Sequence, residues 1–144
     1  MLHEVEIIYT GPQIKDSIKV QSSKDSHAVL KEYYDPKKID YKEMFYVLLL
    51  NRANYCIGIS KIAVGSTTGV IVNIKEIFQL ALKMNASALI ISHNHPSGNL
   101  MPSDSDNELT KKVKQAATFL ELNLLDHIIV TSQGYYSYAD EGQM

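Results

Sequence analysis

Two short apolar runs constrain what this chain folds into more than any other feature. Residues 44–50 read MFYVLLL and residues 88–91 read ALII, so both segments are almost wholly apolar. A strand with one exposed face alternates apolar and polar side chains, whereas a strand covered on both faces is apolar throughout. The two runs therefore predict central strands of a sheet whose faces are both covered.

Apolar residues repeat at helical spacing in three further segments. The first covers residues 23–34 and ends at Pro36, because proline cannot continue a helix. The second follows Asn73, which with Glu76 three residues later can cap a helix. The third covers residues 104–120. The covering layers of the sheet are expected to be these three helices.

Shorter segments rich in β-branched and aromatic residues predict the remaining strands. They are residues 5–9, 18–20, 55–62, 70–72, 127–131 and 135–138, with a loop at 65–69. The 144 residues suit a single domain, with residues 1–22 as peripheral strands. The predicted fold class is α/β, with a mixed β-sheet flanked by helices.

Charge and cysteine content exclude several classes of protein. The net charge of −2 gives no basic field for nucleic acid, so direct DNA or RNA binding by this chain alone is not expected. Cys56 is the only cysteine, which excludes an internal disulfide and any zinc site built on two thiolates. With neither a basic, apolar leader nor an apolar run of 18 residues, the chain is expected in the cytoplasm and outside membranes.

The second apolar run leads directly into a pair of histidines. His93 and His95 are two residues apart, so on an extended strand their side chains point to the same face. Asp106 follows at the start of the third predicted helix, where a carboxylate can swing back over the strand end. Two imidazoles and one carboxylate leave one coordination position open, which is the form of catalytic zinc sites. We therefore expect a Zn²⁺ site here.

A simpler interpretation of the same residues stays open. Ser103 and Asp106 also form a helix-capping signature, in which the serine oxygen accepts a backbone N–H. Asp106 would then be only a capping partner, and the histidines would be loop residues. Other hydrolase signatures, such as His-Glu-x-x-His, Gly-x-Ser-x-Gly and a glycine-rich P-loop, do not occur in the sequence.

The spacing of the candidate ligands resembles a known motif. The pattern His93-x-His95, seven residues, Ser103, two residues, Asp106 is similar to the JAMM motif of the JAB/MPN metalloprotease superfamily. The string HNHPSG at 93–98 and the segments around Asp126 and Tyr136 resemble the RadC branch of that superfamily. The resemblance covers residues 23–144 and implies a JAB/MPN architecture, which is cytidine-deaminase-like.

The resemblance also implies roles for individual residues. His93, His95 and Asp106 would bind zinc, and Ser103 would stabilise the oxyanion. Glu43, immediately before the first apolar run, would be the catalytic base that deprotonates a zinc-activated water. The implied activity is that of a zinc metallopeptidase or isopeptidase acting on a peptide or protein.

Neighbouring polar residues have expected roles of a different kind. Asn94 and Ser97 are candidates for orienting the histidines or the substrate, because metal ligands generally need such partners. We expect His127, beside Asp126, to be a hydrogen-bonded structural residue rather than a ligand.

A second hypothesis is a module that recruits a peptide or a DNA-processing partner without turnover. A third is a nuclease or DNA-repair protein, as the RadC name suggests. RadC proteins carry a helix-hairpin-helix domain ahead of this one, and 144 residues do not accommodate both, so the link to repair receives little support. The sequence names no substrate, and it leaves the oligomeric state open, with a homodimer as one option.

Overall fold

Five strands form one mixed sheet in the computed structural model, which describes residues 1–65 and 69–144. They are β1 (Met44–Leu50), β2 (Cys56–Val64), β3 (Ala88–Asn94), β4 (Asn123–Thr131) and β5 (Gly134–Ser137). Their order across the sheet is β2-β1-β3-β4-β5. Neighbouring strands are antiparallel except β3 and β4, which are parallel. The predicted α/β class with a mixed sheet is confirmed.

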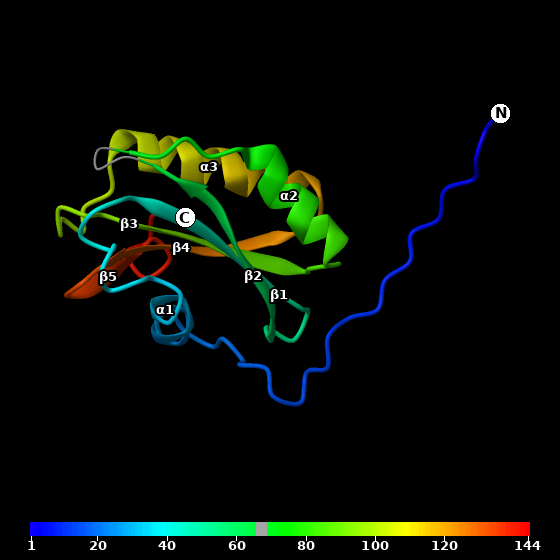
Figure 1. Ribbon diagram of the computed structural model, residues 1–144, viewed down its shortest axis with the longest axis horizontal. Coiled ribbons are helices and arrows are strands. Elements are labelled where there is room, and N and C mark those ends of the chain that lie inside the picture. Colours follow the sequence, from blue (N-terminus) through cyan, green and yellow to red (C-terminus); the bar gives the residue numbers. More distant parts are fainter. Residues whose placement is uncertain (66–68) are drawn as a thin grey trace.

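Three helices among the described residues cover the two faces of the sheet: α1 (Ser23–Lys31), α2 (Ile74–Lys83) and α3 (Asp104–Phe119). α1 lies on one face, and α2 and α3 lie on the other (Figure 1). α2 begins directly after Asn73 as predicted, but the Asn73 side chain forms no capping hydrogen bond there. Within the described chain, no helix combines the length and apolar character needed to cross a bilayer.

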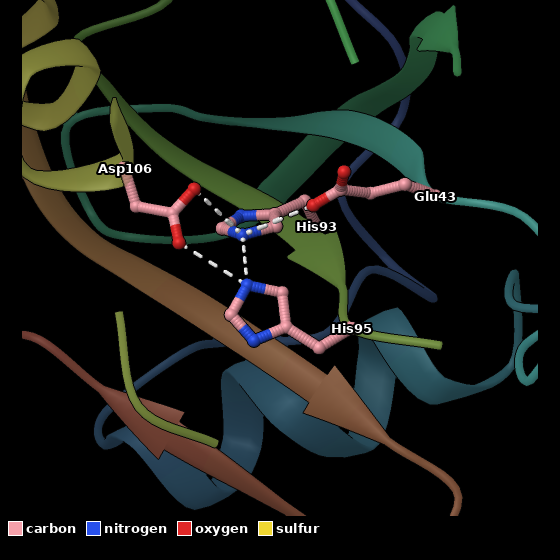
Figure 2. Close-up of side chains that lie close together, drawn as sticks. All are labelled: Glu43, His93, His95 and Asp106. Atoms are coloured by element: carbon pink, nitrogen blue, oxygen red, sulfur yellow. Dashed lines mark hydrogen bonds and ion pairs between the residues drawn. The ribbon is translucent and has the colours of Figure 1, made fainter. Parts of the chain in front are cut away.

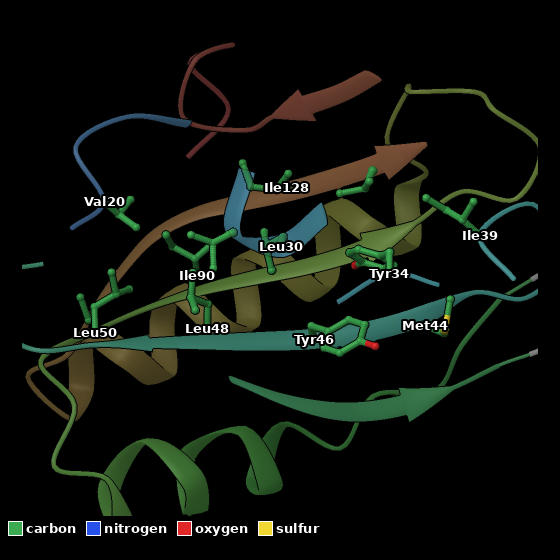
Figure 3. Close-up of a cluster of buried hydrophobic side chains, with 13 residues drawn as sticks. Val20, Leu30, Tyr34, Ile39, Met44, Tyr46, Leu48, Leu50, Ile90 and Ile128 are labelled. Carbon is green, nitrogen blue, oxygen red and sulfur yellow. The ribbon is translucent and has the colours of Figure 1, made fainter. Parts of the chain in front are cut away.

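The alternation of side chains along β1 and β3 divides the core into two clusters. Even-numbered residues of both strands, such as Leu48 and Ile90, pack on the α1 side together with Leu30 (Figure 3). Odd-numbered residues, such as Val47 and Ile91, pack on the side of α2 and α3. All residues of both strands are buried, which explains why the runs at 44–50 and 88–91 are apolar without alternation.

The N-terminal segment differs from the prediction. The strands expected at residues 5–9 and 18–20 do not form in the described structure, apart from one bridge between Lys19 and Tyr55. The chain before this bridge runs away from the sheet (Figure 1). β-Branched residues favour an extended backbone, but a strand needs a neighbouring backbone to complete its hydrogen bonds.

The strand predicted at residues 70–72 is also absent from the described sheet. Val70 and Val72 pack partly against the core cluster below α2 and α3, whereas Ile71 is 95% exposed. The segment thus has the alternating burial of a strand without a pairing partner. Residues 66–68 of the loop predicted at 65–69 lie outside the described residues.

Asn94 ends β3 and holds the chain just ahead of β1. Its Nδ2 donates to the carbonyl oxygens of Ile39 and Lys42, both at 2.8 Å, and its Oδ1 accepts from the Met44 N–H at 2.6 Å. The side chain is fully buried on the α1 side, away from the candidate metal ligands. The prediction that Asn94 orients the histidines or the substrate is therefore wrong: its side chain fixes the segment that carries Glu43.

We expect the Asn94→Asp substitution to lower the free energy of unfolding by about 3 kcal/mol or more. The carboxylate has nearly the same shape and keeps the acceptor for Met44, but it brings negative charge and no donor to the carbonyl oxygens of Ile39 and Lys42, one buried and one partly buried. Urea denaturation measures the change. Asn123→Asp, the same substitution at an exposed position of β4, is the control and should change stability by less than about 0.5 kcal/mol. Equal losses in the two variants would contradict this role of Asn94.

Candidate metal centre

The end of β3 carries both histidines of the predicted site. The strand extends through His93, and the His95 N–H continues the parallel ladder by donating to Val130 O at 3.1 Å. Both rings therefore project from the same face of the sheet, the one covered by α2 and α3. His93 is buried and His95 is partly buried. The two imidazole rings converge, as predicted.

Asp106 reaches the histidines from the first turn of α3. Ser103 is the N-cap residue: its Oγ accepts from the Asp106 N–H at 3.1 Å, and its own N–H donates to Asp106 Oδ2 at 2.8 Å. The capping box predicted as an alternative to the metal site is therefore present. The same carboxylate also lies beside both imidazoles, so the two interpretations describe one structure.

The ligand atoms lie at distances that suit a small cation (Figure 2). His93 Nε2 is 2.9 Å from His95 Nε2 and 3.2 Å from Asp106 Oδ1, and His95 Nε2 is 3.1 Å from Asp106 Oδ2. Tetrahedral zinc with bonds of about 2.0–2.1 Å separates its ligands by about 3.3 Å. Together with Glu43, these residues offer ligand atoms that all lie within 4.8 Å of one another. The cluster could thus bind a metal ion.

Glu43 reaches the cluster from the residue before β1. Its carbonyl accepts from the Gly65 N–H at 2.8 Å, which extends the pairing with β2 and fixes its backbone. The carboxylate points toward the histidines, with Oε1 3.6 Å from His93 Nε2 (Figure 2). Burial raises the pKa of the Glu43 carboxyl above its ordinary value, against the opposing effect of His93 and His95. Of the neighbouring ligand atoms, Glu43 Oε1 thus lies farther from His93 Nε2 than Asp106 Oδ1 and His95 Nε2 do.

The outer hydrogen bond of His95 indicates which of its nitrogens carries the proton. Nδ1 lies 2.6 Å from the carbonyl oxygen of Asn99, which can only accept, so Nδ1 is the protonated atom. Nε2 of the neutral ring then turns a lone pair toward Asp106 Oδ2, another acceptor. Two acceptors this close need a cation or a further proton between them. The donor set fits a metal ion.

The ionisation of Asp106 and His95 favours the binding of a cation between them. Burial raises the pKa of the Asp106 carboxyl, but the adjacent His93 and His95 rings outweigh burial and hold this pKa well below its ordinary value. Burial lowers the pKa of His95, yet the neighbouring Asp106 carboxylate and the hydrogen bond to Asn99 raise it above the usual value. An anionic Asp106 therefore persists beside the rings.

A cavity of about 530 Å³ adjoins the cluster. Two loop segments line it, one around Val70 and one from Pro96 to Met101, and the candidate ligands line it as well. The volume falls within the range of ligand-binding pockets, roughly 300–1,000 Å³. The site is thus accessible to a group larger than water.

Two serines of the predicted site also line this cavity. Ser103 uses its oxygen to accept the Asp106 N–H, which leaves its hydroxyl hydrogen available to a group in the cavity. Ser97 accepts from the Asn99 N–H at 3.2 Å and has no hydrogen bond to either histidine. Of the two, only Ser103 is tied directly to a candidate ligand.

His127 belongs to the site in a way that the sequence did not reveal. Its backbone N–H donates to Asp126 Oδ1 at 2.7 Å, but its ring lies between His93 Nδ1, at 2.8 Å, and Thr110 Oγ1, at 2.6 Å. Burial holds the pKa of His127 well below its ordinary value. The prediction of a hydrogen-bonded residue, not a ligand, agrees with this geometry. The contact between His127 and His93 depends on the parallel register of β3 and β4. That register could not be predicted from the sequences of the two strands.

Comparisons with known proteins agree with this fold. Residues 20–143 match the profile of the RadC-like JAB domain. A UPF0758 protein of Flavobacterium johnsoniae is 40% identical over 124 residues, which cover 86% of this chain and 53% of that protein. A UPF0758 protein of Haemophilus ducreyi is 37% identical over 115 residues, covering 80% of this chain and 52% of that protein. A UPF0758 protein of Gloeothece citriformis is 46% identical over 96 residues, covering 67% and 40%, respectively.

The chain spans about half the length of the curated relatives it matches. The profile match nevertheless includes every strand and helix of the sheet and its layers, together with all the candidate ligands. This chain therefore belongs to the RadC family, and the structure described above is its RadC-like JAB domain.

Proposed function

We propose that this domain is a zinc-dependent hydrolase that cleaves a peptide or isopeptide bond in a protein or peptide substrate. The observation that carries the proposal is the convergence of Glu43, His93, His95 and Asp106 beside a cavity. Two imidazoles and a carboxylate are a donor set typical of catalytic zinc, which keeps one position for water or substrate. Membership of a JAB-domain family supports the same chemistry.

Each side chain has a defined task in this proposal. The two Nε2 atoms of His93 and His95 and a carboxylate oxygen of Asp106 would bind the ion. Zinc supplies a Lewis acid that polarises a carbonyl oxygen and lowers the pKa of water to about 7. The backbones of these residues are fixed by β3 and by the capped start of α3, so little reorganisation is needed on binding.

Glu43 and Ser103 would handle the proton and the developing charge. The Glu43 carboxylate, whose Oε1 lies 3.6 Å from His93 Nε2, would accept a proton from the attacking water on Oε1. The same oxygen then passes the proton to the leaving nitrogen, so that the amine departs neutral. The Ser103 hydroxyl donates to the oxygen of the scissile carbonyl as negative charge develops on it.

Metal binding is tested first. We expect His93→Ala to weaken zinc binding by more than about 100-fold, because losing even a hydrogen-bond partner of a ligand costs about 10–100-fold. Elemental analysis gives zinc per chain, and competition with a chromophoric chelator gives the affinity. His27→Ala, which removes a ring stacked on Tyr135 outside the cluster, should bind zinc as wild type does. A wild-type protein that takes up no zinc would refute the proposal.

The role of Glu43 is tested with Glu43→Gln, which keeps the size of the side chain but cannot accept the proton. We expect zinc content to be unchanged and hydrolysis to fall by at least about 10²–10⁴-fold. Turnover is measured on quenched fluorogenic libraries of peptides and of lysine-linked isopeptides. Glu32→Gln, at the exposed end of α1, is the matched control and should retain full activity.

One result would decide against this assignment of Glu43, and another would decide against hydrolysis by this domain. Unchanged turnover in Glu43→Gln would exclude it as the base. If wild type binds zinc, cleaves neither library, and retains the same proteins on an affinity column as Glu43→Gln does, the domain is a binding module without turnover.

Ser103 contributes both to the proposed reaction and to the helix cap, and a second N-cap serine separates these effects. We expect Ser103→Ala to lower kcat by about 10²–10³-fold and the stability by about 1 kcal/mol. Ser22 caps α1 by accepting the Asp25 N–H, so Ser22→Ala should show the same stability loss with normal kcat. Steady-state kinetics and thermal unfolding measure the two quantities. If both serine variants keep the kcat of wild type, Ser103 does not stabilise the oxyanion.

A further inference from the structure

A chain of buried hydrogen bonds connects the backbone of one candidate ligand to the side chain of another. Thr110 Oγ1 lies 2.7 Å from the Asp106 carbonyl oxygen and 2.6 Å from His127 Nδ1. On the other side of the same ring, His127 Nε2 lies 2.8 Å from His93 Nδ1. Thr110 is 4% exposed, and His127 and His93 are at most 1% exposed. Water therefore does not replace any partner in this chain.

The carbonyl group at one end gives the chain a direction. A carbonyl oxygen has no proton, so the single hydroxyl hydrogen of Thr110 must lie between Oγ1 and Asp106 O. Thr110 Oγ1 can then only accept from His127, which places the proton of this neutral ring on Nδ1. His127 Nε2 consequently accepts from His93, and the proton of His93 lies on Nδ1.

The reverse direction has an unfavourable contact. If the Thr110 hydroxyl donated to His127, its oxygen and the Asp106 carbonyl would be two acceptors 2.7 Å apart with no hydrogen between them. His127 would then donate to His93 Nδ1, and the neutral His93 ring would carry its proton on Nε2. That proton would occupy the lone pair that faces the metal site.

We infer that Thr110 and His127 are positioning residues that hold the proton of His93 on Nδ1 and so keep its Nε2 available to a metal ion. The inference rests on the proposed metal site. In His95 a single hydrogen bond keeps Nε2 available, because Nδ1 carries the proton and donates directly to Asn99 O. We call the hydrogen-bonded series Thr110, His127 and His93 the relay. The ring of Tyr138 stacks on His127, with centroids 4.8 Å apart and an angle of 7° between the planes, which fixes the plane of the His127 ring.

Zinc affinity tests the relay with three threonine variants. Thr110→Val keeps the shape of the side chain but removes the hydroxyl, and we expect zinc to bind about 10–100-fold more weakly. Thr110→Ser restores the hydroxyl and should bind zinc nearly as wild type does. Thr118→Val is the matched control, because Thr118 forms the same kind of bond, to Lys114 O at 2.9 Å, on the exposed side of α3. Zinc affinity in Thr110→Val equal to that in wild type would overturn the inference.

Nitrogen-15 NMR of the metal-free protein tests the relay independently of metal binding. Two-bond correlation spectra distinguish a histidine protonated on Nδ1 from one protonated on Nε2. We expect His127 to carry its proton on Nδ1 in wild type and in Thr110→Ser, and on Nε2 in Thr110→Val. A wild-type His127 protonated on Nε2 would overturn the inference, whereas a wild type that fails to bind zinc would overturn only the proposed function.

Two His127 variants keep the relay testable if Thr110→Val does not fold, which thermal unfolding reports. His127→Gln retains an acceptor for His93 Nδ1 and should bind zinc more tightly than His127→Phe, which fills the space without one. Equal zinc affinities in these two variants would argue against the relay.

Discussion

The antiparallel pairing of β1 with β3 is the constraint on which the site depends. Phe45 lies opposite His93, and continuing this register beyond the ladder brings Glu43 opposite His95. Because side chains alternate between the faces of a sheet, the residues at 43, 45, 93 and 95 all face α2 and α3. A shift of one residue would send Glu43 to the α1 side, where it would meet the buried apolar cluster below Leu30. Asn94 opposes such a shift from that side, since two hydrogen bonds join it to the segment ahead of β1 and a third joins it to Met44, the first residue of β1.

The features that could be predicted from the sequence depend on neighbours close along the chain. The runs at 44–50 and 88–91 indicated strands buried on both faces, and both became central strands. The spacing of His93, His95 and Asp106 was informative because one strand end and one helix start hold all three. The capping box and the ligand set looked like rival interpretations, yet one carboxylate accepts from Ser103 N–H and lies beside both rings. A cap fixes the position of Asp106, which is also what a ligand requires.

The features that could not be predicted depend on partners far along the chain. His127 meets His93 because β4 pairs in parallel with β3, and neither strand carries a polar alternation that would reveal the register. Side chains alternate along β3, so Asn94 points to the face opposite His93. Its backbone partners, however, lie about fifty residues away along the chain and could not be predicted. Residues 5–9 and 70–72 have the composition of strands and lack a neighbouring backbone in the described sheet. Intrinsic preference for an extended conformation does not determine whether a pairing partner exists.

The cavity walls and the ligand cluster come from different parts of the chain. The candidate ligands sit on a strand end, a helix cap and the residue before β1, all fixed by hydrogen bonds of the sheet and of α3. The segments around Val70 and from Pro96 to Met101 line the cavity but belong to no strand or helix. Substitutions in these segments can reshape the entrance without moving the candidate ligands, so the shape of the cavity and the ligand cluster can change independently during evolution.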